Sequence, residues 1–196
     1  MGFVETDYFG VYGYMTADQG VRNGSDLMLC TTGNDFNTVT VLTNSSKQAL
    51  REVVEHPGGV TVAALTDNDE LMFVRQFRYP YSEVLLELPA GKLEYGEDPF
   101  EAGKRELREE TGAVAEHYID LGKFYPTPGY CGEIIHMYAA KGLSFTSLDL
   151  DDDEFLAPEK IPLEKAVEMV MNNEIRDGKT QTAVLKVAQK RRKGEI

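Results

Sequence analysis

Residues 91–113 read GKLEYGEDPFEAGKRELREETGA, and they say more about this chain than any other stretch. Their glycines, acids and arginine follow a fixed spacing: G, five residues, E, seven residues, then R-E-aliphatic-x-E-E-x-G-aliphatic. Ala113 is small for the last aliphatic position. So many matches at fixed spacing are a far stronger signal than a lone glycine motif. The matching residues are Gly91, Glu97, Arg105, Glu106, Leu107, Glu109, Glu110 and Gly112.

The ends of the second half of this stretch carry signals for a helix. Asp98 can accept hydrogen bonds from the first unpaired backbone N–H groups, and Pro99 suits the first helical position. Glu101 stands three residues after Asp98, which is the spacing of a capping box. Gly112 can adopt the left-handed conformation that ends a helix. The sequence therefore predicts a helix between Asp98 and Gly112.

The acidic residues within this predicted helix are arranged to bind a metal ion. Glu106, Glu109 and Glu110 are spaced i, i+3 and i+4, so their carboxylates share one face. Like charges on one face repel, and a hard cation removes that cost. Mg²⁺ prefers carboxylate oxygens together with water and substrate phosphates. We therefore expect a Mg²⁺ site, at which Mn²⁺ can substitute. A solvated acidic face is the alternative interpretation, and it leaves the surrounding pattern unexplained.

Strands and helices alternate along the rest of the chain. Two hairpins are expected, residues 38–42 with 51–55 and residues 60–65 with 71–77, because β-branched runs flank polar turns. Residues 1–37 have no sustained period and suggest strands and turns. Later elements are expected as strands at 84–88, 119–124 and 134–140, a helix at 163–175 and a last helix capped by Asp177. This alternation predicts an α/β/α sandwich with a mixed sheet.

The composition limits the kinds of partner. A net charge of −13 opposes general nucleic-acid binding, which depends on Lys and Arg. The sequence has no apolar run of about 18 residues, so we expect no membrane span. The N-terminus lacks a signal-peptide layout, and Cys30 and Cys131 form no metal or disulfide spacing, so a cytoplasmic location is expected. The basic run at 190–193 is expected to end the last helix, where cations suit the dipole.

The full pattern of residues 91–113 resembles the Nudix box, the signature of hydrolases that cleave a nucleoside diphosphate linked to another group. The resemblance implies the same Nudix-type α/β/α sandwich. Residues 1–55 would then form an N-terminal β-rich dimerisation region, and residues 56–196 would form the Nudix catalytic domain.

Other segments resemble the ADP-ribose pyrophosphatase branch of this family. Pro128 lies sixteen residues after Gly112, where this branch has proline, and the likeness covers about residues 38–190. It implies the reaction ADP-ribose + water → AMP + ribose 5-phosphate, with related ADP-sugars as further substrates. The segments are REVVEHPGGV at 51–60, VRQFRYP at 74–80, ELPAGKLE at 87–94, YPTPGYCGE at 125–133 and IRDGKTQTAVL at 175–185.

The resemblance also implies substrate contacts and a homodimer. Arg51 and Glu52 would contact the adenine and its ribose from across the dimer interface. Arg78 would bind the diphosphate, and a guanidinium suits this role because it offers two aimed donors and a permanent charge. The alternatives are an exposed surface pair for Arg51 and Glu52, and for Arg78 a stem that covers the sheet edge.

The same resemblance implies a metal centre built around the helix. The backbone carbonyl of Ala90 would join the glutamates Glu106, Glu109 and Glu110 as a metal ligand. Glu109 would thereby serve catalysis through the metal. Glu97 and Arg105 would form an ion pair that orients the metal carboxylates.

The resemblance to this branch also implies that the base that activates water lies in the acidic run at residues 149–154. Asp152 stands at the usual base position, and Glu154 at a neighbouring metal-binding carboxylate. This departs from the family, in which the base is usually glutamate. Glu154 can take over that role, and Glu133 is a third candidate. A solvated loop is the alternative interpretation of the run.

Other functions compete with ADP-ribose hydrolysis. The chain could hydrolyse another nucleoside diphosphate derivative, such as a GDP-sugar or a dinucleotide. A nucleotide-sensing module with a dead box is a second alternative, although the intact box glutamates oppose it. A prenyl diphosphate isomerase would need a catalytic cysteine and a set of metal-binding histidines, and the chain has few of either.

Overall fold

The computed structural model describes residues 3–6, 11–14, 38–44, 47–145 and 158–196, with side chains from residue 53 onward. The chain divides into two compact units. Residues 1–56 and 127–133 form the smaller unit, and residues 57–126 and 134–196 form the larger unit.

The described residues of the smaller unit form two antiparallel strand pairs. β1 (Phe3–Thr6) pairs with β2 (Val11–Tyr14), and β3 (Thr38–Asn44) pairs with β4 (Lys47–Val53). The predicted hairpin is therefore confirmed, with its second strand beginning earlier than expected. Beyond β4 the backbone of Val54 donates to Tyr130 and accepts from Gly132, which attaches residues 127–133 to this unit.

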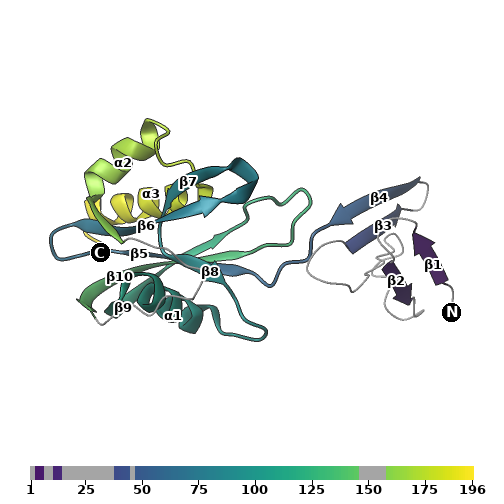
Figure 1. Cartoon of the computed structure of the whole chain (residues 1–196), viewed down its shortest axis with the longest axis horizontal. Coiled ribbons are helices and arrows are strands. Elements are labelled where there is room, and N and C mark those ends of the chain that lie inside the picture. The colour runs from purple at the N-terminus through teal and green to yellow at the C-terminus, as the bar shows by residue number, and fades with distance from the viewer. Residues whose placement is uncertain (1–2, 7–10, 15–37, 45–46, 146–157) are drawn as a thin grey trace. The chain divides into compact units, whose positions relative to one another are not determined.

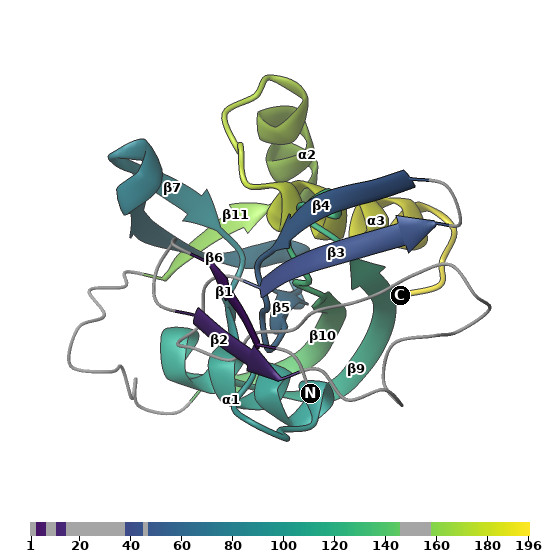
Figure 2. The ribbon, with the colours of Figure 1, turned by 90° about the vertical axis from the view of Figure 1, so that its right-hand side faces the viewer.

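A mixed four-stranded sheet forms the centre of the larger unit. Its strands run in the order β8, β5, β10, β9. β5 (Gly59–Ala64) lies parallel to β10 (Ile135–Phe145) and antiparallel to β8 (Ala90–Lys92), and β9 (Ala113–Phe124) pairs antiparallel with β10. Figure 2 shows β9 and β10 side by side as two long curved strands. Both extend well beyond the ranges expected from the sequence.

A second sheet has three strands in the order β11, β6, β7. β6 (Glu70–Arg78) lies between β11 (Glu159–Pro162) and β7 (Glu83–Glu87), and the 3-10 turn η1 (Tyr79–Tyr81) joins β6 to β7. The sequence analysis did not anticipate β11.

The predicted hairpin between β5 and β6 is wrong. Its turn forms, since Thr66 N donates to the Glu70 carbonyl, and one bridge joins Leu65 to Leu71. Beyond that bridge the two strands separate into different sheets. Both edges of β5 are already occupied by β8 and β10, so β6 must find its partners elsewhere.

Helices cover both faces of the central sheet (Figure 1). α1 (Pro99–Thr111) packs against β5, β8 and β9, whereas α3 (Gly178–Arg192) packs against β5 and β10 from the other side. α2 (Leu163–Met171) packs on α3 and ends four residues before the predicted Ile175. The arrangement confirms the predicted α/β/α sandwich.

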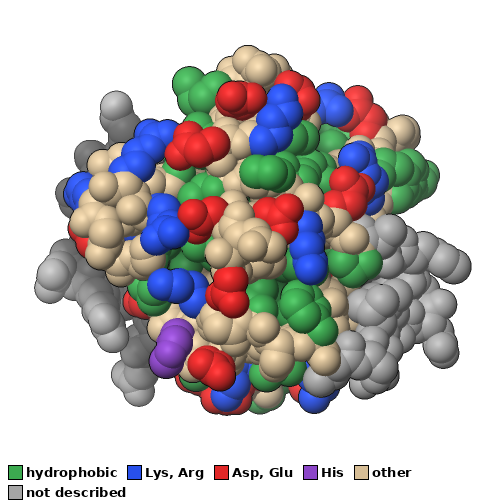
Figure 3. Space-filling view, turned by 90° about the vertical axis from the view of Figure 1, so that its left-hand side faces the viewer, with side chains coloured by type: hydrophobic (Ala, Val, Ile, Leu, Met, Phe, Trp, Pro, Cys, Tyr) green, Lys and Arg blue, Asp and Glu red, His purple; other side chains and the backbone are tan. Residues whose placement is uncertain are grey.

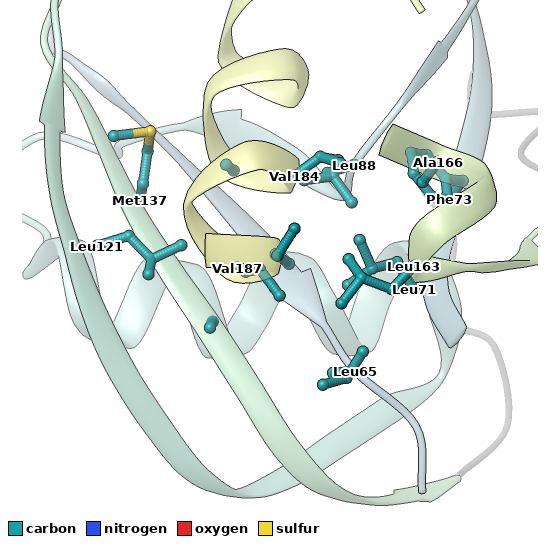
Figure 4. Packing of buried hydrophobic residues seen from close by; sticks show 14 of the residues in the cluster. Leu65, Leu71, Phe73, Leu88, Leu121, Met137, Leu163, Ala166, Val184 and Val187 are labelled. Carbon is teal, nitrogen blue, oxygen red and sulfur yellow. The ribbon is translucent and has the colours of Figure 1, made fainter. Parts of the chain in front are cut away.

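The core explains why β5 is apolar along its whole length. Val60 and Val62 belong to the cluster that packs against α1, and Ala63 belongs to the cluster that packs against α3. Because successive side chains of a strand face opposite sides, both faces of β5 are buried. Figure 4 shows the second cluster, in which Leu71 and Phe73 of β6 lie beside Leu163 and Ala166 of α2, and Val184 and Val187 of α3 belong to the same cluster. Burying each large side chain contributes about 1.5–3 kcal/mol.

The basic run at the end of α3 is neutralised by acids of the larger unit. Arg191 donates two hydrogen bonds of 2.9 Å to Asp69, and Arg192 lies 3.0 Å from Glu164. Helix α3 ends at Arg192 with Lys193 as its C-cap, so the run ends the last helix, as predicted. Figure 3 shows one face of the chain, on which acidic and basic side chains lie interspersed.

Candidate active site

The predicted caps of α1 are confirmed, with one exception. Asp98 accepts hydrogen bonds from Phe100 N at 3.0 Å and from Glu101 N at 3.2 Å, and Gly112 ends the helix with φ of 69°. The capping box is wrong, because the Glu101 carboxylate binds Lys104 Nζ at 3.0 Å instead. The caps fix where α1 begins, and thereby which side chains face the Ala90–Lys92 strand.

Glu106 lies directly against the backbone of Gly91. A Cβ placed on Gly91 would meet Glu106 Oε1 at 2.0 Å and Oε2 at 2.4 Å. Such distances are impossible for any side chain, so only glycine lets the carboxylate occupy this place. The spacing of Gly91 and Glu106 in the sequence thus reflects a contact between β8 and α1.

Glu110 is almost fully buried and anchors the neighbouring residue. It is 1% exposed, and its Oε2 accepts a hydrogen bond of 3.0 Å from Ala90 N. The Pro89 carbonyl is held as well, by Thr61 Oγ1 at 3.1 Å and by Val62 N at 2.9 Å. The backbone on both sides of the Pro89–Ala90 peptide is therefore fixed before any ligand binds.

Arg105 connects the other carboxylates of the site. Its Nε and Nη2 donate to Glu97 at 3.0 and 3.1 Å, and its Nη1 donates to Glu106 at 2.8 Å and to Glu109 at 2.9 Å. The bonds to Glu97 chiefly raise the pKa of Arg105 and lower the pKa of Glu97. Glu97 also accepts from Glu94 N at 2.9 Å. Arg105 thus bridges the turn before α1 to the acidic face.

The chemistry of this donor set fits a hard divalent cation. Glu106, Glu109 and Glu110 offer only oxygen donors, and two of them are buried beside a fixed backbone. Within the part of the chain that the structure describes, no three His, Cys, Asp or Glu side chains converge as an assembled metal site. Arg105 supplies the compensating positive charge to Glu106 and Glu109. A bound cation would compete with these contacts.

Arg78 is held by a buried acid that the sequence analysis did not single out. Arg78 Nε and Nη2 donate to the two oxygens of Glu87 at 2.7 and 2.6 Å. Lys179 Nζ also donates to Glu87, at 2.5 Å. The bonds to Glu87 raise the pKa of Arg78 most, and the charge of Glu110 adds to that effect. The signal available for Glu87 in the sequence was a charged residue within the otherwise apolar run at residues 84–88.

The other candidate residues belong to the smaller unit or lie outside the described residues. Arg51 and Glu52 lie on β4, opposite Thr40 and Val39 of β3. Glu133 belongs to the smaller unit, and its Oε1 lies 3.8 Å from His56 Nε2. The remaining two candidates, Asp152 and Glu154, lie outside the described residues.

The α/β/α sandwich, together with the acidic helix α1 that lies against Gly91 of β8, is the arrangement by which the chain can be compared with known families. The family profile of the NUDIX domain matches residues 55–181, and the chain belongs to this family. The resemblance of residues 91–113 to the Nudix box is thereby confirmed.

Three individual relatives are similar to the chain over about 70% of its length. The chain is 42% identical over 142 residues to the ADP-ribose pyrophosphatase of Bacillus subtilis, covering 71% of this chain and 77% of the relative. It is 44% identical over 136 residues to the methanol dehydrogenase activator of Bacillus methanolicus, covering 68% and 74%. A GDP-mannose pyrophosphatase of Yersinia enterocolitica is 32% identical over 146 residues, covering 69% and 76%.

A solved structure supports the fold. The crystal structure of an ADP compounds hydrolase superposes with a TM-score of 0.72 at 22% identity, covering 84% of this chain and 92% of that chain. Among the described residues, no helix combines the length and the apolar character that crossing a bilayer requires.

Proposed function

We propose that this chain hydrolyses ADP-ribose to AMP and ribose 5-phosphate in a reaction that depends on Mg²⁺, with Mn²⁺ as a substitute and related ADP-sugars as further substrates. The observation that carries the proposal is the placement of Glu106 against Gly91 together with the bond from Ala90 N to Glu110. It is supported by similarity to an ADP-ribose pyrophosphatase at 42% identity.

Four groups of the larger unit would hold the metal. They are the carboxylates of Glu106, Glu109 and Glu110 and the backbone carbonyl of Ala90. When bound, the metal neutralises charge on the diphosphate and lowers the pKa of water. The chain holds these groups in place, because Glu110 binds Ala90 N and Gly91 leaves room for Glu106. Arg105, bonded to Glu97, orients Glu106 and Glu109.

Substrate contacts and proton transfer are assigned to other residues. Arg78 binds the diphosphate through donors that Glu87 does not occupy. Arg51 and Glu52 contact the adenine and its ribose across a homodimer interface formed by residues 1–55, with residues 56–196 as the catalytic domain. Asp152 accepts the proton of the attacking water, and Glu154 is its metal-binding neighbour. Glu133 is the alternative base. The cytoplasm is the proposed compartment.

A second candidate function is hydrolysis of a GDP-sugar. It is favoured by the relative named GDP-mannose pyrophosphatase, which covers a similar share of the chain at lower identity. Both functions use the same metal-binding groups. They differ only in which nucleoside and which sugar the rest of the site accepts.

A panel of substrates distinguishes hydrolysis of ADP-ribose from hydrolysis of a GDP-sugar. Purified protein is incubated with Mg²⁺ and, in turn, ADP-ribose, ADP-glucose, GDP-mannose and a dinucleotide, and the products are identified by mass spectrometry. We expect kcat/KM for ADP-ribose to exceed that for GDP-mannose by at least about tenfold, which corresponds to about 1.4 kcal/mol of transition-state discrimination. A preference for GDP-mannose of that size would replace the proposed function with the alternative.

A further inference from the structure

Glu87 is a buried carboxylate at the end of β7 that faces two cations. It is 1% exposed. Its Oε1 accepts from Arg78 Nε, and its Oε2 accepts from both Arg78 Nη2 and Lys179 Nζ. Arg78 and Lys179 come from β6 and from the first turn of α3, which lie far apart in the sequence. Glu87 therefore joins three elements at one point.

The network is attached to the segment that leads into the metal-binding strand. Glu87 stands three residues before Ala90 in the chain. The next residue, Leu88, donates its backbone N–H to Thr180 Oγ1 at 3.0 Å, which binds the same segment to α3 a second time. Ala90 N is bonded to Glu110. A displacement of Glu87 would therefore also shift Ala90, and a displacement of Ala90 would shift Glu87.

The bonds to Glu87 fix how Arg78 is presented. Two parallel bonds to one carboxylate hold the guanidinium plane and use only its Nε edge. A guanidinium has five N–H donors, so most of them, including both on Nη1, stay directed elsewhere. The Arg78 side chain is 36% exposed, whereas its partner is buried. Arg78 is thus rigid on one edge and accessible on another.

Charge explains why Glu87 has two basic partners. A buried carboxylate is costly unless it is paired, and one arginine would suffice to pair it. Lys179 gives the trio of Arg78, Glu87 and Lys179 an excess of one positive charge. Asp177 also binds Lys179, at 3.0 Å, so the four side chains together carry no net charge, while the N-terminus of α3, which Asp177 caps through Thr180 N, adds a partial positive charge. In a chain of net charge −13, a neutral cluster that contains two cations beside a helix N-terminus still favours an anion over a uniformly acidic surface.

We propose that Glu87 is a positioning residue, which holds Arg78 and Lys179 side by side as a pair of cations for the diphosphate of the substrate. The inference rests on the proposed function, since it takes a nucleoside diphosphate as the ligand. Arg78 contacts the diphosphate through its Nη1 edge, and Lys179 supplies the second positive charge beside it.

The test compares KM with kcat for ADP-ribose in a set of variants. Glu87→Gln keeps the size of the side chain and removes its charge, Lys179→Met removes the second cation, and Arg78→Ala removes the first. Glu159→Gln is the matched control, because Glu159 pairs with Arg75 on the same strand β6 at an exposed position. Glu87→Gln and Arg78→Ala are also combined in one protein.

Glu87→Gln and Lys179→Met should each raise KM by about 10- to 100-fold, the range expected when a charge-assisted hydrogen bond is lost, with kcat within about threefold of wild type. Glu159→Gln should leave both constants unchanged. Because Glu87 acts partly through Arg78, the combined variant should raise KM by much less than the product of the two single effects.

Other results would overturn the proposal. They are a wild-type KM in Glu87→Gln or in Lys179→Met, or effects of Glu87→Gln and Arg78→Ala that multiply in full. If Glu87→Gln does not fold, Glu87→Asp keeps the charge on a shorter side chain, and a folded Glu87→Asp with wild-type KM contradicts the positioning role.

Failure of the proposed function would look different. If the wild-type protein does not hydrolyse ADP-ribose but hydrolyses another nucleoside diphosphate, only the proposed function is overturned. The same variants then test the role of Glu87 with that other substrate. A wild type that hydrolyses no nucleoside diphosphate overturns both.

Discussion

The carboxylate of Glu106 occupies the space where a side chain on Gly91 would be. A Cβ at that position would lie 2.0 Å from Glu106 Oε1, so the Glu106 carboxylate of helix α1 can lie against strand β8 in this place only because residue 91 is glycine. The contact gives a geometric reason why the pattern at residues 91–113 begins with glycine: the proposed metal site needs the space beside Gly91 for the Glu106 carboxylate.

Gly91→Ala should therefore displace Glu106 and weaken metal binding. We expect the Mg²⁺ concentration for half-maximal activity to rise by at least about tenfold, because one carboxylate can no longer reach its place. Gly129→Ala is the control, since a Cβ there would meet nothing within 4 Å. Equal Mg²⁺ dependence in Gly91→Ala and wild type would show that the contact does not serve the metal.

The variant Arg105→Lys should distinguish the role of Arg105 in orienting the glutamates from the role of its positive charge. Lysine keeps the positive charge but cannot span Glu97, Glu106 and Glu109 at once, as the guanidinium does. We expect kcat to fall by about tenfold or more while circular dichroism stays unchanged. Steady-state kinetics at saturating Mg²⁺ provide the measurement, and a kcat within about twofold of wild type would assign Arg105 a purely structural role.

The fold around these residues was predictable where the signals are local. The ends of α1 follow from Asp98, Pro99 and Gly112, because caps act within one turn of the helix. The shared acidic face follows from helical spacing alone. These local rules predicted the helix and its carboxylates, and alternation of elements predicted the sandwich.

What was missed depends on contacts between residues distant in the chain. Lys179 meets Glu87 across 92 positions, and no local pattern encodes that pairing. The hairpin of β5 and β6 was wrong for the same kind of reason, since β8 and β10 take the two edges of β5. Competition among distant partners decides such pairings.

Acid should destabilise the larger unit partly through Glu87. Burial raises the pKa of Glu87, but the bonds from Arg78 and the charge of Lys179 outweigh it, so the pKa in the folded chain lies below the ordinary value. The stability from this group is therefore full above the unfolded pKa of about 4.3 and is lost as pH falls through the folded pKa. Thermal unfolding of wild type between pH 3 and pH 7 should show this loss.

Glu87→Gln provides the comparison for that pH dependence. The variant lacks the titrating carboxyl, so its Tm should fall less steeply below about pH 4 than the Tm of wild type. Parallel curves for the two proteins would mean that other carboxyls govern the acid transition.

The association state is tested by the mass in solution. The resemblance implies a homodimer, and the strands β3 and β4 pair as a two-stranded sheet among the described residues, an arrangement that is marginal in water unless it packs against further chain. Sedimentation should give about twice the chain mass of 21.9 kDa. A monomer at micromolar concentration that still hydrolyses ADP-ribose would contradict both the dimer and the roles of Arg51 and Glu52.

The base is tested by three amide substitutions measured side by side. Asp152→Asn should lower kcat with little change in KM, because the group acts on water and not on substrate binding. Glu154→Gln and Glu133→Gln complete the set. The kcat of Asp152→Asn could stay within about threefold of wild type, which is under about 1 kcal/mol of barrier, while the kcat of Glu154→Gln or Glu133→Gln falls far below it. In that case the base is the residue whose substitution lowers kcat.

The most direct measurement is hydrolysis of ADP-ribose by wild type and by Glu109→Gln, with Mg²⁺ and with excess EDTA. Wild type should release AMP and ribose 5-phosphate only when Mg²⁺ is present, and added Mg²⁺ should restore activity after EDTA. Glu109→Gln should remain folded with kcat lower by about 10²-fold or more, because the charge that holds the metal is lost. Full activity in excess EDTA, or wild-type kcat in Glu109→Gln, would contradict metal-dependent hydrolysis by the α1 glutamates.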